Sequence, residues 1–484
     1  MPPRRRAQSL LQVRPVNEVC LELTDNSVIR KSAIDFFKVE GRNPAPSAAM
    51  LTDQFINVNR RLSTLLDVRI ECNYDGNDVF LAIQSGNAVG AIPLISPRSA
   101  GHDLGLVVQP RFRWDGLGPM LGEMGWRVAP SPLRLPLLHR SERRVPLWVL
   151  SSMVLTRVAA LLDSLTPKFS MVREHPNSPR GMIDWSEYVR RSMPTGNFLS
   201  LPCVFPDLRD DRRLKGSIRY TLDRQIQALQ SQRQHGAFVH RLIEFAQGLL
   251  QRVLSVPAYV PTALDLQNWI QRPMRSDKFL DGLQAIEWTV EERGLAGMSD
   301  LQGLPWRMPM DQFFEAWVET IFTLVARKTG AQIRTGHQHQ TNHPIDWRPA
   351  FLGSQKSLVP DIWLEWNSVT LIIDAKYKRH WEEINQHSWS RVEEKLREDH
   401  RADLFQVLAY ANLAKTPIVI ACLAYPCSPK TWKALEESHR LNHRAIISVG
   451  SRAVHLWLTA IPMMADAEKI SCLFSESVRS ALAA

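Results

Sequence analysis

The sequence predicts a multidomain α/β (α+β) protein, because three regions of the chain differ in their pattern of apolar residues. Short apolar segments separated by turn residues predict a mainly β N-terminal domain, residues 1–130. Apolar residues three or four positions apart predict a helical middle region, residues 131–305. Residues 306–484 combine both patterns and predict a C-terminal α/β domain.

The composition fits a globular protein of several domains. The chain has 484 residues, 44% hydrophobic and 22% charged, which allows two or three substantial cores. Lys and Arg outnumber Asp and Glu by 59 to 49, and this basic excess favours a polyanionic partner. Six cysteines without a CxxC pair do not form a disulfide framework, so we expect a reduced, cytoplasmic compartment.

Five short strands are predicted in the N-terminal domain. Turn sequences such as residues 73–77 and 85–87 separate them. The predicted strands are Val19–Leu23, Val68–Cys72, Val79–Ile83, Ala88–Ile92 and Leu104–Val108.

Helical periodicity marks two segments of the middle region, Leu147–Leu165 and Phe238–Leu254. The first lies in the longest apolar stretch of the chain, which also holds Arg157 and Asp163. These charges would be costly in hydrocarbon, so we expect a buried helix and no membrane partner.

A helix is predicted at Asp311–Lys328, with Asp311 as its cap and Gly330 as its stop signal. Glu315 lies beside the apolar stripe of this helix. Its simplest role is a favourable interaction with the helix dipole in the first turns. The carboxylates that follow in the chain suggest a second role for Glu315, in a site shared with them.

The segment from Leu358 to Lys378 predicts a β-hairpin with a turn at Asn367-Ser368. Asp361 starts the first strand and Asp374 lies near the end of the second, so the two carboxylates converge. Lys376 lies two residues after Asp374 and therefore on the same face. A second hairpin is predicted at Arg444–Ala460, turning at Gly450-Ser451.

Convergent carboxylates beside a lysine suit phosphodiester hydrolysis. Carboxylate oxygens are ligands that Mg²⁺ prefers. A lysine orients or deprotonates the attacking water and offsets charge in the transition state. The alternative is that Asp374 and Lys376 form a simple surface ion pair at a strand end.

Two further groups of polar residues flank the hairpin. Gln406 and Tyr410 are four apart and share a face of the helix predicted at Arg401–Ala411. A zinc site at His337, His339 and His343 would need a further ligand, and no cysteine lies nearby in the sequence. These residues are therefore interpreted as a polar loop, with contact to DNA as a second possible role. The chain has no GxxxxGK[ST] motif and is therefore not itself a P-loop NTPase.

The C-terminal motifs, taken in order, resemble those of PD-(D/E)XK nucleases, which have a restriction-endonuclease-like fold, with a RecB-like QxxxY helix. These motifs are Glu315, Pro360-Asp361, Asp374-Ala375-Lys376 and Gln406-x-x-x-Tyr410. The resemblance implies that Asp361, Asp374, Glu315 and the Ala375 carbonyl bind Mg²⁺, with Mn²⁺ as a substitute. It also implies that Lys376 is the catalytic lysine and that Gln406 and Tyr410 touch substrate.

The wider chain resembles the McrC-like nuclease subunits of McrBC-type restriction systems. Besides the run Asp374–Lys378, the N-terminal segments 85–90 and 108–112 and the central segment 180–184 carry this resemblance. A departure is Pro110-Arg111-Phe112, where the family usually has Pro-Lys-Ile. The resemblance implies a DNA endonuclease for antiviral defence, in a hetero-oligomer with an McrB-like AAA+ GTPase or ATPase that docks on the N-terminal domain.

Two other functions remain open from the sequence. One is a non-catalytic adaptor that binds DNA and activates the NTPase. The other is a RecB-like repair exonuclease that needs free DNA ends.

Overall fold

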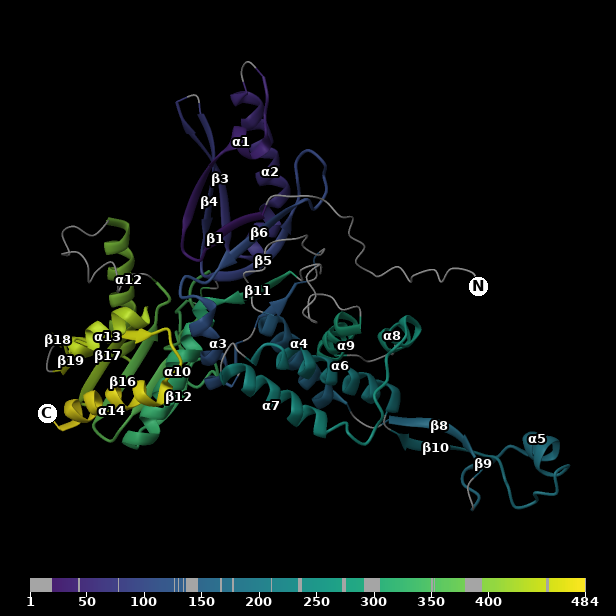
Figure 1. The fold of residues 1–484 in the computed structure, drawn as a ribbon. Helices are drawn as coiled ribbons and strands as arrows, with labels where there is room; N and C mark the ends of the chain where they lie inside the picture. The colour runs from purple at the N-terminus through teal and green to yellow at the C-terminus, as the bar shows by residue number, and fades with distance from the viewer. Residues whose placement is uncertain are drawn as a thin grey trace. The chain divides into compact units, whose positions relative to one another are not determined.

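The computed structural model describes residues 20–483, except residues 42–43, 77, 126, 129, 134, 136–146, 166–167, 176–177, 210, 234–236, 272–275, 291–304, 350, 352, 379–393 and 450–451. The chain forms two compact units (Figure 1). Among the described residues, those between 150 and 233 and between 239 and 290 belong to one unit, and those between 20 and 149, 237–238 and those between 305 and 483 belong to the other. The structure is mixed α/β, as predicted.

Two sheets form from the N-terminal segments of the larger unit. A five-stranded sheet has the order β1 (Cys20–Thr24), β6 (Leu104–Gln109), β5 (Ala88–Leu94), β11 (Trp306–Pro309), β7 (Ser131–Pro132). A three-stranded sheet has the order β2 (Val28–Ser32), β4 (Asp78–Ser85), β3 (Val68–Asp75). All five predicted strands are confirmed.

Helix α2 (Ala45–Leu65), which packs against β3, was not predicted from the sequence. Its buried face includes the polar residues Thr52, Asn59 and Ser63, so its apolar periodicity is weak. The buried Asn59 side chain forms two hydrogen bonds with the backbone of Ile95. It donates to the Ile95 carbonyl at 2.8 Å and accepts from the Ile95 N–H at 2.7 Å. A buried amide is acceptable here because it is paired.

Strand β11 ties the start of a C-terminal helix to the N-terminal sheet. It pairs antiparallel with β5, and the Met310 N–H donates to the Asn87 carbonyl at 2.7 Å. Gly90 permits this close pairing, because a Cβ at this position would lie 2.1 Å from the Trp306 carbonyl oxygen. The helix that follows β11 is thereby anchored at its first residue.

A six-stranded mixed sheet forms the C-terminal part of the same unit. Its order is β12 (Gln332–Thr335), β15 (Ile362–Glu365), β16 (Val369–Ala375), β17 (Ile418–Cys427), β19 (Arg452–Pro462), β18 (Asn442–Val449). Residues Val369–Asp374 of β16 are all buried, which confirms a central strand. The second predicted hairpin is confirmed as β18–β19, and its predicted turn lies outside the described residues.

Helices pack on this sheet: α10 (Met310–Thr329), α12 (Glu394–Ala411) and α13 (Pro429–Glu437). The last helix, α14 (Ala467–Ala483), packs against α10. Helix α10 confirms the predicted helix and ends at Gly330 with φ 72°. The predicted cap was wrong: Pro309 occupies the N-cap and Asp311 lies in the first turn, because the pairing of β11 brings the chain into the helix two residues earlier.

The smaller unit is mainly helical. Its helices are α4 (Leu147–Ser164), α6 (Arg212–Gln230), α7 (Ala237–Gln251), α8 (Ala263–Ile270) and α9 (Asp277–Val290), and α4 and α7 confirm the predicted helices. Arg157 in α4 donates to Gln284 Oε1 at 2.8 Å and lies 4.8 Å over the Trp288 ring, so its charge is accommodated against α9. None of the described helices is long and apolar enough to cross a bilayer.

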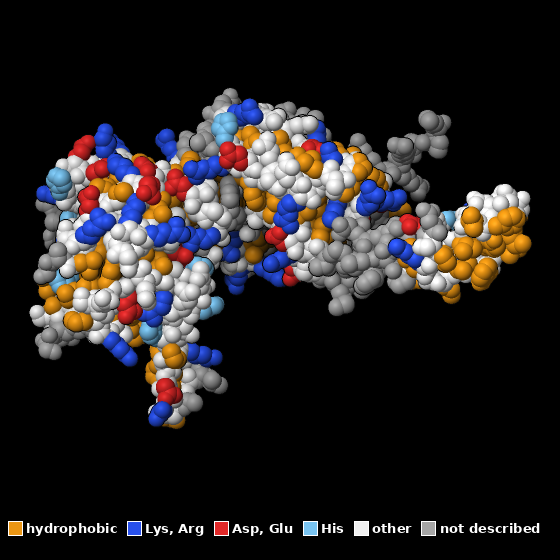
Figure 2. Space-filling view, turned by 90° about the horizontal axis from the view of Figure 1, so that it is seen from below, with side chains coloured by type: hydrophobic (Ala, Val, Ile, Leu, Met, Phe, Trp, Pro, Cys, Tyr) orange, Lys and Arg blue, Asp and Glu red, His pale blue; other side chains and the backbone are white. Residues whose placement is uncertain are grey.

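A small sheet in this unit was not predicted. It pairs β8 (Lys168–Glu174), β10 (Cys203–Arg209) and β9 (Met182–Ile183), with the short helix α5 (Trp185–Glu187) beside them (Figure 1). Pro206 and Asp207 interrupt the alternation of β10 and hide the strand in the sequence. Exposed apolar side chains gather on this sheet and its loops (Figure 2): Met171, Met182, Trp185, Val189, Met193, Phe198 and Leu199.

A buried polar cluster joins the N-terminal segments to the central strand. The Asp25 carboxylate, fully buried, accepts from the Tyr377 hydroxyl at 2.8 Å and from the Arg111 N–H at 2.6 Å. The Arg111 guanidinium lies 3.6 Å from Asp25 Oδ2 and 4.4 Å from the centre of the Tyr377 ring. Burial, followed by the Asp25 charge, raises the pKa of the Tyr377 hydroxyl well above its ordinary value, so this hydroxyl stays protonated and donates.

We expect Asp25→Ala to lower the free energy of unfolding by about 3–5 kcal/mol, because it leaves the Arg111 charge buried without a partner. Tyr377→Phe removes one hydrogen bond and costs about 1 kcal/mol. The matched control is Asp346→Ala, which breaks an exposed pair with Arg348 and costs at most about 1 kcal/mol. Urea unfolding of the three variants measures these differences, and an Asp25→Ala protein as stable as Asp346→Ala would contradict the role of the cluster.

Candidate active site

The β15–β16 hairpin brings the two predicted aspartates together. The strands pair antiparallel with Ile362 opposite Ile373, so Asp361 and Asp374 follow directly at the same end of the pair. The Ala375 N–H donates to Asp361 Oδ2 at 2.7 Å. This hydrogen bond fixes the Asp361 carboxylate against the strand that carries Asp374.

Lys376 lies over the same carboxylates. Its Nζ is 2.8 Å from Asp374 Oδ2, although the contact does not have the angles of a hydrogen bond, and no described group donates to that oxygen. Asp374 is 1% exposed and the Lys376 side chain 18%. These values argue against the alternative of a simple surface ion pair.

The carboxylates form a buried negative cluster. Burial raises the pKa of Asp361 well above its ordinary value, and the charges of Asp374 and Glu315 raise it further. Burial also raises the pKa of Asp374, although the Lys376 charge opposes this shift. One lysine therefore does not compensate the cluster, and a further cation would be favourable there.

Lys376 remains a cation in this environment. Burial lowers the pKa of its ammonium, but the negative charges of Asp374, Asp361 and Asp403 together outweigh burial, and the net shift is upward. The ammonium is therefore suited to donating to a phosphate oxygen. It is poorly suited to removing a proton from water in this state.

Glu315 approaches the cluster from helix α10 and is partly buried. Burial raises the pKa of its carboxyl, the neighbouring Glu319 and Asp374 raise it further, and His337 opposes the shift. The residue before it, Phe314, packs on the Tyr377 ring with 6.1 Å between ring centres. This contact holds the glutamate helix against the end of the lysine strand.

Helix α12 places Gln406 and Tyr410 on one face, as predicted, with Gln406 Nε2 donating to the Tyr410 hydroxyl at 2.8 Å. The helix packs against β17 and β16. Burial raises the pKa of Tyr410, and the charges of Asp374 and Asp361 add to the shift. Both side chains therefore lie beside the carboxylate cluster.

A second polar network, which was not predicted from the sequence, lies beside the cluster. Lys378 Nζ donates to both carboxylate oxygens of Asp403, at 2.8 and 3.0 Å. The Tyr425 hydroxyl donates to Asp403 at 3.1 Å, so it accepts from His400 Nδ1, 3.0 Å away. Lys378 and Asp403 lie in motif segments, but Tyr425 is brought in by the parallel pairing of β17, which has no local sequence signal.

The residues present fit a magnesium ion. The available donors, the carboxylates and the Ala375 carbonyl, are hard oxygen ligands, and the buried Asp374 Oδ2 lacks an aligned donor. Within the described parts of the chain, no three His, Cys, Asp or Glu side chains are already grouped around a metal position. Mg²⁺ typically takes one or two carboxylates and completes its shell with water and substrate phosphate, so an open site of this kind suits it.

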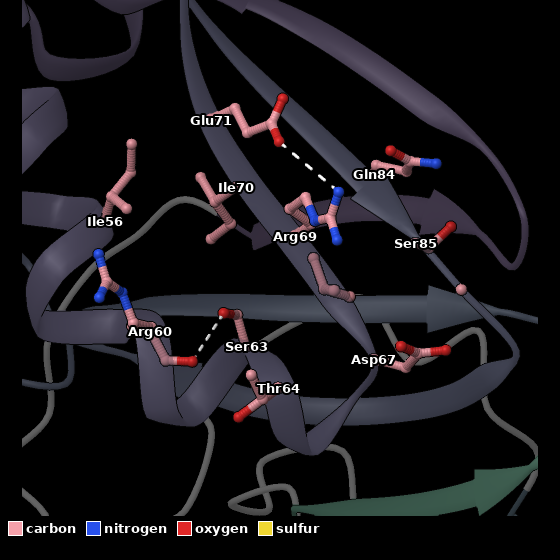
Figure 3. A pocket seen from close by; sticks show the side chains of 12 residues that line it. Ile56, Arg60, Ser63, Thr64, Asp67, Arg69, Ile70, Glu71, Gln84 and Ser85 are labelled. Carbon is pink, nitrogen blue, oxygen red and sulfur yellow. Dashed lines mark hydrogen bonds and ion pairs between the residues drawn. The ribbon is translucent and has the colours of Figure 1, made fainter. Parts of the chain in front are cut away.

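A separate hollow lies between α2 and the β3–β4 pair (Figure 3). Its wall carries both signs of charge, with Arg69 4.0 Å from Glu71, and Asp67 accepting from the Asn87 N–H at 2.9 Å. These groups pair with one another or with the backbone, and the hollow lacks the carboxylate and lysine group of the C-terminal sheet.

The fold and the cluster define a multidomain α/β protein with a buried carboxylate–lysine site at the end of a mixed sheet. A family model described as "McrBC 5-methylcytosine restriction system component" matches residues 135–426, more than half of the chain. The chain belongs to this family. A comparison with curated proteins finds no match.

Two solved structures are similar to the chain. A Thermococcus gammatolerans assembly of McrB AAA+ hexamers with bound McrC contains a chain that is 12% identical, with a TM-score of 0.41, covering 96% of this chain and 100% of that one. A chain of the cryo-EM structure of the T. gammatolerans McrBC complex is 13% identical, with a TM-score of 0.25, covering 66% and 90%. Because both scores are low, the membership rests on the family match.

We expect Asp361→Asn to stabilise the fold without divalent metal, by about 1 kcal/mol, because it removes one charge from the buried cluster. The pKa of Asp361 is higher in the folded state than in the unfolded state. The free energy of unfolding that depends on protonated Asp361 is therefore present at low pH and is lost as pH rises through the folded-state pKa. Thermal melting in EDTA from pH 4 to 8 should show a smaller loss of stability in the variant. Added Mg²⁺ should then raise the melting temperature more in the wild type, and an equal rise in both proteins would count against a metal at Asp361.

Proposed function

We propose that this chain is the endonuclease subunit of an McrBC-type restriction system and hydrolyses DNA phosphodiester bonds with Mg²⁺. The observation that carries the proposal is the convergence of Asp361, Asp374 and Lys376 at the buried end of one hairpin. The order of these residues supports a PD-(D/E)XK nuclease domain. Glu315, Gln406 and Tyr410 complete the proposed site.

Asp361 and Asp374 would hold Mg²⁺, with Glu315 and the Ala375 carbonyl as further oxygen donors. When bound, Mg²⁺ supplies a Lewis acid that offsets phosphate charge and lowers the pKa of water. The Ala375 N–H keeps Asp361 oriented. The Lys376 ammonium, which Asp374 holds in place, donates to a non-bridging oxygen of the scissile phosphate as negative charge develops there. Gln406 and Tyr410 would contact the DNA beside that phosphate.

We propose an McrB-type AAA+ GTPase as the partner that delivers DNA and gates cleavage. Support comes from the family membership of the chain and from the absence of a P-loop motif in its sequence. The exposed apolar side chains around β8, β9 and β10 are typical of an interaction surface. The biological role would be defence against foreign DNA that carries modified cytosine.

The decisive measurement is cleavage of closed-circular plasmid, with and without 5-methylcytosine, in Mg²⁺ and with or without the GTPase. We expect Asp374→Ala and Lys376→Ala to slow cutting by at least about 100-fold, and EDTA to stop it. Lys430→Ala, which changes an exposed lysine on α13, should cut at the wild-type rate.

The two alternatives give different results in the same assay. A Lys376→Ala protein that keeps the full biological activity would identify a non-catalytic adaptor. Cutting of linear DNA without cutting of circles would identify an exonuclease. Loss of cutting in Lys430→Ala to the same extent as in Lys376→Ala would remove the evidence for a specific lysine.

A further inference from the structure

Two of the three histidines singled out in the sequence, His337 and His339, lie in one tight turn that follows β12, the histidine turn (residues 335–341). The His339 N–H donates to the Gly336 carbonyl at 2.8 Å, and the Gln340 N–H donates to the Thr335 carbonyl at 3.1 Å. His339 itself has φ 57°. The turn is therefore closed by its own backbone.

The histidine turn is fastened to the segment that presents Asp361. The Gly336 N–H donates to the Asp361 carbonyl at 2.8 Å, and Thr341 Oγ1 donates to the Pro360 carbonyl at 2.6 Å. A Cβ on Gly336 would lie 2.9 Å from the Pro360 carbonyl oxygen, so the approach requires glycine. The position of the turn is thus fixed relative to the proposed metal ligand.

His337 is held in one orientation by a buried carboxylate. Its Nδ1 lies 2.7 Å from Glu319 Oε2, and the Glu319 side chain is 7% exposed. Arg127 forms an ion pair with the same carboxylate and donates to Thr320 Oγ1 at 2.7 Å. The ion pair with Arg127 therefore fixes the Glu319 carboxylate, and the carboxylate in turn fixes the orientation of the His337 imidazole.

This orientation leaves the other edge of the ring available. With Nδ1 directed at Glu319, Nε2 points away from that carboxylate and makes no hydrogen bond to any described residue. The His337 side chain is 43% exposed. Glu319 lies one helical turn after Glu315 on α10, and the hydrogen bond from Gly336 to the Asp361 carbonyl holds the turn that carries His337 beside the proposed site.

The other two histidines are placed differently. His339 is exposed at the tip of the turn. His343 packs on the Trp363 ring with 5.5 Å between ring centres. Only His337 combines a fixed orientation with an available nitrogen near the carboxylates, among these three residues.

We propose that His337 is a further substrate-contacting residue, donating from Nε2 to a phosphate oxygen of the DNA strand held at the carboxylate cluster. This inference rests on the proposed nuclease function. An imidazolium between a carboxylate and a phosphate donates from both nitrogens. Glu319 and Arg127 are positioning residues, since they act through His337.

The test compares His337→Ala with His339→Ala in Mg²⁺-dependent plasmid cleavage. Loss of one charge-assisted hydrogen bond should lower kcat/KM by about tenfold or more in His337→Ala, with His339→Ala at the wild-type value. His337→Lys should recover part of the loss, because it restores a cation. Glu319→Gln should lower kcat/KM in the same direction as His337→Ala.

DNA binding gives a second readout that a structural role would not move. In an Asp374→Ala background, removal of His337 should reduce the slope of log binding constant against log salt by about 1. Suppose that the wild type cuts and that the His337→Ala protein cuts and binds DNA as the His339→Ala protein does. This result would overturn the role of His337 and leave the proposed nuclease function intact. A wild type that cuts under none of the conditions would overturn the nuclease function, and this inference with it.

Discussion

The candidate site depends on the register of one antiparallel pair, β15 with β16. Side chains alternate between the faces of a strand, so a shift by one residue would turn Asp374 and Lys376 to the opposite face and away from Asp361. Buried apolar residues along β15 and β16 favour the observed register, because any shift would expose part of them. The hydrogen bond from Ala375 to Asp361 then adds a polar contact that only this register allows.

The cluster is costly to the fold. Asp361, Asp374 and Glu315 are buried or partly buried, their pKa values are raised, and Lys376 is the one cation that contacts them closely among the described residues. Such an arrangement persists only where the surrounding structure is stable enough to hold it. The central position of β16, between β15 and β17, provides that stability.

The N-terminal segments also support the site, although they lie far from it in sequence. Tyr377, one residue after Lys376, reaches a cluster with Asp25 and Arg111, and β11 joins the start of α10 to strand β5. The end of β16 and the start of α10, which carry Asp374, Lys376 and Glu315, are therefore attached to the N-terminal segments. Arg111, where the resembled family usually has lysine, stacks on Tyr377 through a planar guanidinium, which an ammonium would not reproduce.

Local patterns gave the C-terminal helix, the hairpin and the adjacent Gln406–Tyr410 pair, because these rest on apolar periodicity and on spacings of two and four residues. The same patterns failed for α2, whose buried face is partly polar, and for β8 and β10 in the middle region. They also gave the wrong cap for α10, since the entry into that helix depends on strand pairing with β5.

The sequence alone therefore determined which residues are available for chemistry and on which face of each element they lie, because both follow from short-range backbone geometry. The tertiary structure decided how they are supported. Arg127 reaches Glu319 across 192 positions, and Tyr377 reaches Asp25 across 352. Contacts of this kind arise only when distant segments pack, and no local pattern of residues encodes them.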